Sequence, residues 1–193
     1  MTALDDVNSE PVEQAAERLR ACNAAPVFVE ELLAGRPYPS AEALVAHAEQ
    51  VARALPWDQV AQALAAHPRI GDRVDGSSAE AQASRREQSS MSDADAAVRA
   101  ALVDGNRAYE QRFDHVFLIR AAGRSPEEML AELRRRLDND AATERAEVTE
   151  QLTQITALRV KGMVDHAMTT AERASQGAPA TEERNEAGVE PVN

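Results

Sequence analysis

The sequence predicts an all-α fold, a single-domain compact multi-helix bundle. Three observations support this prediction. Apolar residues recur at helical spacing in several stretches, and the 44% hydrophobic content is mostly Ala, Leu and Val with only 3% aromatic residues. Only one short apolar run, residues 116–119, has the character of an extended segment. Small aliphatic side chains suit closely packed helices, and 193 residues are enough for one domain with a sizeable core.

The first part of the chain is expected to hold three helices. Ser9 is a candidate N-cap for the first. A turn over residues 35–39 precedes a helix that begins at Ser40. A third, short helix is expected to begin near Pro56 and to end at His67.

The second part is expected to begin with a loop, residues 72–79, and a helix over residues 78–89. Residues 92–95 open the next helix, and a short irregular segment is expected near residues 114–124. The run Ser125-Pro126-Glu127-Glu128 is a capping box with proline at the first helical position, so a helix starts there and stops near residue 139. A long helix follows over residues 141–168. We therefore expect a flexible N-terminus (1–8), a helical domain (9–168) and a disordered tail (169–193).

The charge balance argues against several classes of partner. The formal net charge of −12 disfavours nucleic acid and anionic membrane surfaces, because both need a basic footprint. An anionic small substrate would have to be captured by local arginines. A single cysteine, Cys22, excludes an intrachain disulfide, and the sequence shows neither a signal peptide nor an apolar run of membrane-spanning length, so a cytoplasmic location is expected.

His67 is the first candidate for chemistry. Pro68 disfavours the helical conformation at His67, which places the imidazole at a helix end. The exposed carbonyls there carry partial negative charge and favour a protonated ring, which could donate a proton. The ordinary alternative is a C-terminal histidine followed by a proline stop.

Three further positions have both a functional and an ordinary interpretation. Arg159 falls on the apolar stripe of the last helix, either as a buried fork for an oxygen ligand or as a salt-bridged arginine at the edge of the core. Ser84, Glu87 and Gln88 share a helical face, which would suit amide or ureido N–H donors or would simply be solvated. Residues 121–123 form either an oxygen-binding set of backbone amides or a tight turn.

The common catalytic templates are missing from the sequence. The four histidines have no metal-ligand spacing, and neither a phosphate-binding glycine loop nor a nucleophile elbow occurs. We expect no metal and no cofactor.

Taken together, these positions resemble one family, the 2-oxo-4-hydroxy-4-carboxy-5-ureidoimidazoline (OHCU) decarboxylases of the urate-to-allantoin pathway. The matching residues cover most of the chain from Ser9 to about Met168. They are His67-Pro68-Arg69-Ile70-Gly71, Ser84 with Glu87-Gln88, Asn106 with Tyr109 and Phe113, Phe117-Leu118-Ile119, Ala121-Ala122-Gly123-Arg124-Ser125, Arg136-Leu137 with Asn139, Glu144, and Ile155 with Arg159.

The resemblance implies a cofactor-free, all-helical, homodimeric lyase that binds a small ureidoimidazoline. It implies His67 as the catalytic acid or proton shuttle, together with Glu87 and Arg159. It also implies a set of substrate contacts, partly through the backbone. They are Pro68, Ser84, Arg85, Arg86, Glu87, Gln88, Ile119, Arg120, Ala121, Ala122, Gly123 and Arg159. Arg120 and Val160 depart from what the family pattern leads us to expect, and Arg120 could alter substrate capture.

The chemistry agrees with these residues. Loss of CO₂ leaves an electron pair that the conjugated imidazoline ring can accept, and the protein must stabilise charge on the ring and deliver a proton to one face, giving (S)-allantoin. We expect Arg159 and amides near Ala121 to stabilise ring oxygens, Glu87 with Gln88 to grip the ureido arm, and His67 to donate the proton. Two alternatives stay open: a hydrolase of a related ureido compound, and a non-catalytic helical module in which Arg159 and Glu87 are a structural ion pair.

Overall fold

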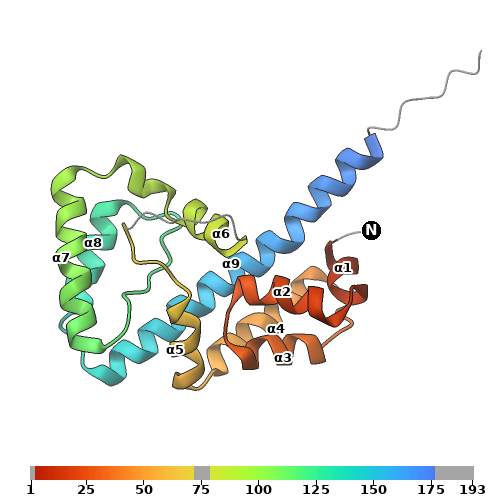
Figure 1. Ribbon diagram of the computed structural model, residues 1–193, viewed down its shortest axis with the longest axis horizontal. Coiled ribbons are helices and arrows are strands. Elements are labelled where there is room, and N and C mark those ends of the chain that lie inside the picture. The colour runs from red at the N-terminus through yellow and green to blue at the C-terminus, as the bar shows by residue number, and fades with distance from the viewer. Residues whose placement is uncertain (1–2, 72–78, 177–193) are drawn as a thin grey trace, which may run out of the picture.

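The structure, a computed structural model, describes residues 3–71 and 79–176, and all regular structure in these ranges is helical. Figure 1 shows their arrangement. The α-helices are α1 (Ala3–Ser9), α2 (Val12–Cys22), α3 (Pro26–Ala34), α4 (Ala41–Ala54), α5 (Trp57–Ala65), α6 (Ala79–Glu87), α7 (Ala96–Phe113), α8 (Pro126–Arg136) and α9 (Ala141–Gln176), with a short 3-10 helix, η1 (Ser89–Asp93), between α6 and α7. The predicted all-α class is confirmed. Within the described residues, no helix combines the length and the hydropathy that a membrane crossing requires.

Three helix starts were correctly predicted from side-chain caps. Ser40 accepts a hydrogen bond from the amide of Ala43 at 3.2 Å, and Asp95 caps α7. The capping box at the start of α8 is complete, because Ser125 and Glu128 each accept a hydrogen bond from the other's backbone amide. These contacts satisfy amides that have no partner inside the helix.

The N-terminal prediction was wrong in two respects. Ser9 does not cap a helix; it is the last residue of α1, and its hydroxyl donates to the carbonyl of Asp5. The segment 1–8, expected to be flexible, contains most of α1, and Val7 is only 1% exposed. The separate helix α3 was also missed, although Pro26 at its first turn is a recognisable start signal.

The end of the last helix also lies later than expected. Helix α9 continues to Gln176, so residues 169–176 are helical where a tail was predicted. The rest of that tail, 177–193, and the predicted loop over residues 72–78 lie outside the described residues.

Helix α9 crosses the whole molecule (Figure 1). Its apolar side chains belong to the first of two apolar clusters, and its Glu144 contacts Tyr109, a member of the second. The first cluster is built by helices α1–α5, Leu118 and the middle of α9. The second is built by α7, α8 and the residues Ile70, Met91, Phe117, Ile119 and Ala121. Two non-helical segments, around residues 67–71 and 115–124, therefore lie at the boundary between the clusters.

The segment after α7 is extended, and the part of the chain that the structure describes contains no strand beside it. Its side chains alternate: Val116 and Leu118 pack on the first cluster, while Phe117, Ile119 and Ala121 belong to the second. By the same alternation, Arg120 faces the side of the first cluster. The irregular segment predicted near residues 114–124 is thus confirmed, and it runs along the boundary.

A buried polar network anchors this segment to α8 and α9. Arg136 and Glu144 are both 0% exposed and pair through Nε and Oε1 at 2.9 Å. Arg136 Nη1 also donates to the carbonyl of Leu118 at 2.8 Å, and the hydroxyl of Tyr109 donates to Glu144. Arg136, Glu144 and Tyr109 are all buried, so removing one member would leave a buried charge with fewer partners.

Replacing Arg136 by Met should lower the free energy of unfolding by about 3 kcal/mol or more, because Glu144 loses its cation in a buried site. The matched control is Arg135→Met on the same helix. Arg135 is exposed and pairs with Glu132 and Glu147 at the surface, so its loss should cost about 1 kcal/mol or less. Urea unfolding at pH 7 measures both, and equal losses would contradict this assignment.

Candidate active site

His67 follows the C-terminal end of α5, as the proline signal predicts, and its side chain is buried. Its backbone amide donates to Leu64 at 2.9 Å, and its ring Nδ1 lies 2.9 Å from the carbonyl of Ala63. A carbonyl can only accept, so Nδ1 carries the hydrogen. The other ring nitrogen, Nε2, is buried and has no hydrogen-bond partner among the described residues. In the neutral ring Nε2 therefore holds a lone pair.

The protonation state of His67 differs from the one expected. The hydrogen bond to Ala63 raises the pKa of His67, as the argument from the helix end anticipates. Burial lowers it more, the positive charge of Arg159 lowers it further, and the resulting pKa is about 4. At neutral pH the ring is therefore neutral, and the expected bias towards a protonated imidazole was wrong.

Arg159 and Glu87 form a bidentate ion pair beside His67. Nε and Nη2 of Arg159 lie 2.8 and 2.9 Å from the two carboxylate oxygens of Glu87, and Nη2 lies 3.2 Å from the hydroxyl of Ser84. Ser84 and Glu87 lie one turn apart on α6, so both face α9, as their spacing predicted. Both charges also influence the pKa of His67, which places the three groups in one neighbourhood.

Four other residues predicted as substrate contacts lie next to α5 or at the end of α6. The side-chain oxygen of Gln88 accepts from the backbone amide of Gly71 at 3.2 Å, so this oxygen ties the end of α6 to the His67 segment. Arg85 and Arg86 are exposed, and Pro68 is half-buried. Their contacts with substrate stay predictions of the resemblance.

The segment 119–123 supplies the remaining predicted residues. Ile119 and Ala121 are buried, and Arg120 and Ala122 are half-buried. Gly123 has a φ of +81°, a conformation that favours glycine, and a Cβ there would meet no atom within 4 Å. No residue that the structure describes accepts a hydrogen bond from the amides of residues 121–123.

Unpartnered polar atoms gather around these elements. Among the described residues, seven buried side-chain nitrogen or oxygen atoms have no hydrogen-bond partner, and five of them lie on the two boundary segments or on elements that contact those segments. These five are His67 Nε2, Ser90 Oγ, Asn106 Oδ1, Arg120 Nε and Arg124 Nε. Since buried polar groups are nearly always satisfied, each of these atoms is a candidate partner for a polar ligand.

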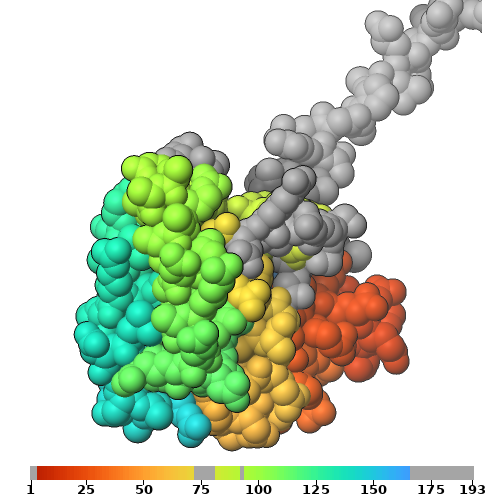
Figure 2. All heavy atoms as spheres, turned by 60° about the vertical axis from the view of Figure 1, so that its left-hand side comes forward, coloured from red at the N-terminus to blue at the C-terminus, as the bar shows by residue number. Residues whose placement is uncertain are grey.

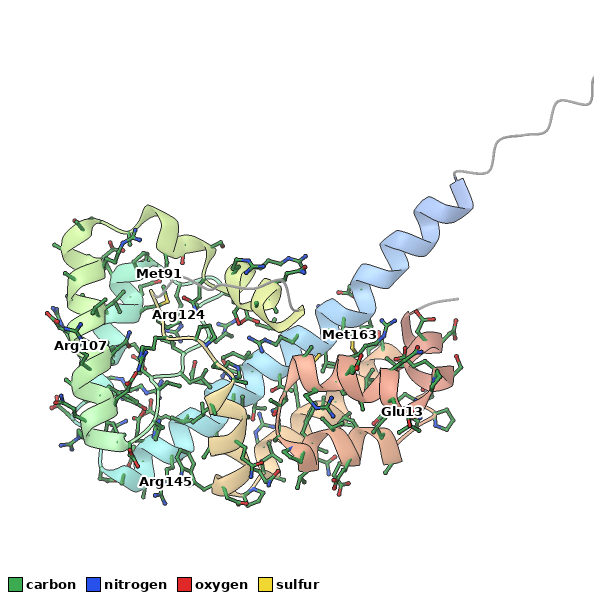
Figure 3. All side chains as sticks on the ribbon, viewed as in Figure 1. Glu13, Met91, Arg107, Arg124, Arg145 and Met163 are labelled. Atoms are coloured by element: carbon green, nitrogen blue, oxygen red, sulfur yellow. The ribbon has the colours of Figure 1, made fainter. Side chains whose placement is uncertain are left out.

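Three of these five residues were not predicted as site residues. The Nδ2 of Asn106 donates to the carbonyl of Ile70 at 3.0 Å, which holds the His67 segment against α7. Arg124 and Met91 lie on the inner side of α7, opposite the outward-pointing Arg107 (Figure 3). Asn106 and Arg124 belong to motifs quoted above, but their sequence context gives no sign that a side-chain atom remains unpaired.

Two surface features complete the description. Seen in Figure 2, α5 and the residues that follow it reach the surface between α7 and the N-terminal helices. A depression on α4, lined by Ala46, Glu49, Gln50, Arg53 and Ala54, contains none of the residues discussed above. No group of three or more potential metal ligands occurs among the described residues.

Cys22 lies close to the ion pair, since the charges of Arg159 and Glu87 both influence its thiol. Burial raises the pKa of Cys22 to about 12, so the thiol stays protonated and unreactive at neutral pH. This agrees with the interpretation of Cys22 as a small packed residue.

The depressed pKa of His67 predicts a pH dependence of stability. The unfolded chain takes up a proton near pH 6.5 and the folded chain only near pH 4, so the unfolded state binds more protons between these values. Stability should therefore fall as pH drops below 6.5, by roughly 2 kcal/mol at pH 5 from this residue alone. Urea unfolding gives the free energy of unfolding of the wild type and of His67→Asn at pH 7 and at pH 5. The wild type should lose more stability between these pH values than the variant. A difference that does not vary with pH would contradict the assignment.

Three comparisons with known proteins show what this chain is similar to. The model of the OHCU decarboxylase family matches residues 8–161. The uric acid degradation bifunctional protein TTL of Arabidopsis thaliana is 29% identical over 178 residues, which are 87% of this chain and 53% of that protein. The chain thus spans about half the length of this curated relative.

Two solved structures show the same fold. A crystal structure of OHCU decarboxylase in the presence of (S)-allantoin superposes with a TM-score of 0.67 at 22% identity, covering 77% of this chain and 98% of the other. A crystal structure of (S)-allantoin synthase gives a TM-score of 0.63 at 18% identity, covering 84% of this chain and 54% of the other. Because the family model covers most of the chain, this protein belongs to the OHCU decarboxylase family.

Proposed function

We propose that this protein decarboxylates 2-oxo-4-hydroxy-4-carboxy-5-ureidoimidazoline to (S)-allantoin and CO₂. The observation that carries the proposal is the buried, unpartnered Nε2 of His67 beside the Arg159–Glu87 pair. Family membership supports it, as do the names of the similar proteins, which refer to uric acid degradation, OHCU decarboxylation and (S)-allantoin.

The reaction needs little covalent help from the protein. When the carboxylated carbon loses CO₂, the bond's electron pair forms a double bond to the neighbouring ureido-bearing carbon, and the ring imine accepts the displaced pair. A solvent proton then neutralises the ring nitrogen. The remaining step moves the hydroxyl proton of the carboxylated carbon to its neighbour, which converts the enol into the carbonyl of allantoin. No cofactor is needed for any of these steps.

His67 has the properties of the group that moves this proton. Its neutral Nε2 accepts the hydroxyl proton as the carbonyl forms, and the resulting imidazolium, which burial destabilises, returns the proton to the ureido-bearing carbon. The ring ends in its starting state. Since the imidazole lies on one side of the substrate, only one enantiomer forms. In this proposal His67 accepts a proton first and donates it second.

The other site residues bind and orient the substrate in this proposal. Arg159, held in place by Glu87 and Ser84, stabilises a ring oxygen, and the open edge of Glu87 accepts N–H donors of the ureido arm. The amides of residues 121–123 stabilise the charge that develops on the ring. Arg120, whose Nε is buried and unpartnered, supplies the local cation that an anionic substrate needs in a chain of net charge −12.

The non-catalytic alternative also has an observation in its favour, since Arg159 and Glu87 do form an ion pair. A purely structural pair does not account for the unpartnered Nε2 of His67 or for the open amides of residues 121–123. A homodimer and a cytoplasmic location stay proposals based on the sequence.

A coupled assay tests the function. Urate is converted by urate oxidase and hydroxyisourate hydrolase with and without this protein, and circular dichroism follows the allantoin. We expect an excess of (S)-allantoin with CO₂ release only when the protein is present, because spontaneous decay gives racemic product. Racemic product in both samples would refute the proposal, and turnover without CO₂ would favour the hydrolase.

Replacing His67 by Asn separates the two functions of the ring. The Asn amide can still donate to the carbonyl of Ala63, but nothing replaces the lone pair of Nε2. We expect kcat to fall about 100-fold or more while the helical circular dichroism spectrum is unchanged.

The matched control is His47→Asn, because His47 is half-buried on α4 and its Nδ1 contacts the hydroxyl of Tyr38 at 2.8 Å, outside the site. It should keep wild-type activity. A fully active, folded His67→Asn protein would exclude the proton-transfer role.

A further inference from the structure

The extended segment 116–121 has an unusual problem in an all-helical protein. Its backbone amides and carbonyls are partly buried, yet the described residues contain no strand with which they could pair. Two side chains provide the hydrogen bonds that a neighbouring strand would otherwise provide. Arg136 Nη1 donates to the carbonyl of Leu118 at 2.8 Å, and the side-chain oxygen of Gln151 accepts from the amide of Arg120 at 2.8 Å.

Gln151 holds the segment at the point where the substrate-binding residues begin. Arg120 directly precedes the open amides of residues 121–123, so the bond to Gln151 fixes the peptide plane from which this stretch of backbone continues. The donor is a backbone amide, so the acceptor must be the oxygen of Gln151, and the side-chain orientation is fixed.

Gln151 and Arg159 lie on the same helix, eight residues apart, which corresponds to about 12 Å along α9. Helix α9 therefore carries the guanidinium that faces Glu87 and the oxygen that holds the 119–123 segment. A single rigid element thus fixes the relative positions of two parts of the site that come from distant parts of the sequence.

We propose that Gln151 is a positioning residue for the decarboxylation: its side-chain oxygen orients the amides of residues 121–123 towards the substrate. It does not itself touch the substrate. This inference rests on the proposed function, and it adds a residue that neither the sequence motifs nor the resemblance identified.

The test compares three variants. Gln151→Met keeps the length of the side chain and removes the acceptor, while Gln151→Glu keeps an acceptor oxygen. Gln154→Met is the matched control, because Gln154 is also half-buried on α9 and its amide donates to Glu150 on the same helix. If Gln151→Met does not fold, Gln151→Ala removes the same acceptor with less bulk.

We expect kcat of Gln151→Met to fall about 10- to 100-fold, since misplacing the groups that stabilise the transition state by a fraction of an ångström to 1 Å has effects of this size. Gln151→Glu should recover most of this loss, and Gln154→Met should match the wild type. The enantiomeric excess of allantoin is measured with enzyme concentrations scaled to equal rates, so that spontaneous decay contributes equally. A lower excess for Gln151→Met under these conditions indicates a displaced substrate.

A second measurement does not depend on activity. The exchange of the Arg120 amide, which loses its acceptor, should be faster in Gln151→Met and unchanged in Gln154→Met. Wild-type rates, stereoselectivity and exchange in a folded Gln151→Met protein would overturn the inference. If exchange is faster in Gln151→Met but the wild-type protein itself shows no decarboxylation, the proposed function is refuted and the positioning of the segment by Gln151 stands.

Discussion

The hydrogen bond from Nδ1 of His67 to the carbonyl of Ala63 determines what this site can do. It uses the carbonyl exposed at the end of α5 and thereby fixes which ring nitrogen carries the hydrogen. Burial and the charge of Arg159 keep the ring neutral, so the lone pair of Nε2 is available at neutral pH. A neutral base inside an apolar environment can accept a proton and readily return it, which is what the isomerisation of an enol to a ketone requires.

The fold supplies this environment by placing two apolar clusters side by side. Each cluster has a continuous core of its own, and the non-helical segments that carry His67 and residues 119–123 run between them. Irregular backbone in such a place needs side-chain partners, and Arg136, Asn106, Gln88 and Gln151 provide them. The side chains that form hydrogen bonds with the backbone of these two segments therefore also hold the candidate site residues in place.

Local signals in the sequence predicted the parts of the structure that depend on neighbouring residues. The capping box at Ser125, the cap at Ser40 and the helix end at His67 are all decided within a few residues, and all three were correct. Ser9 was wrong because capping ability is common to many positions, and here the packing of Val7 extends a helix through residues 3–9 instead. The contact between Arg159 and Glu87, 72 residues apart, is set by packing, and the sequence analysis named this pair only within the non-catalytic alternative. The protonation of His67 was mispredicted for the same reason, because the helix-end effect is local while burial and Arg159 are not.

The tautomer and pKa of His67 test the account most directly. Long-range proton–nitrogen NMR spectra of the protein, labelled with nitrogen-15 in histidine and assigned with His67→Asn, report both ring nitrogens as a function of pH. The account predicts a neutral ring with hydrogen on Nδ1 at pH 7 and a transition to the imidazolium near pH 4. A ring with hydrogen on Nε2 at pH 7, or a transition near the ordinary value of 6.5, would contradict it.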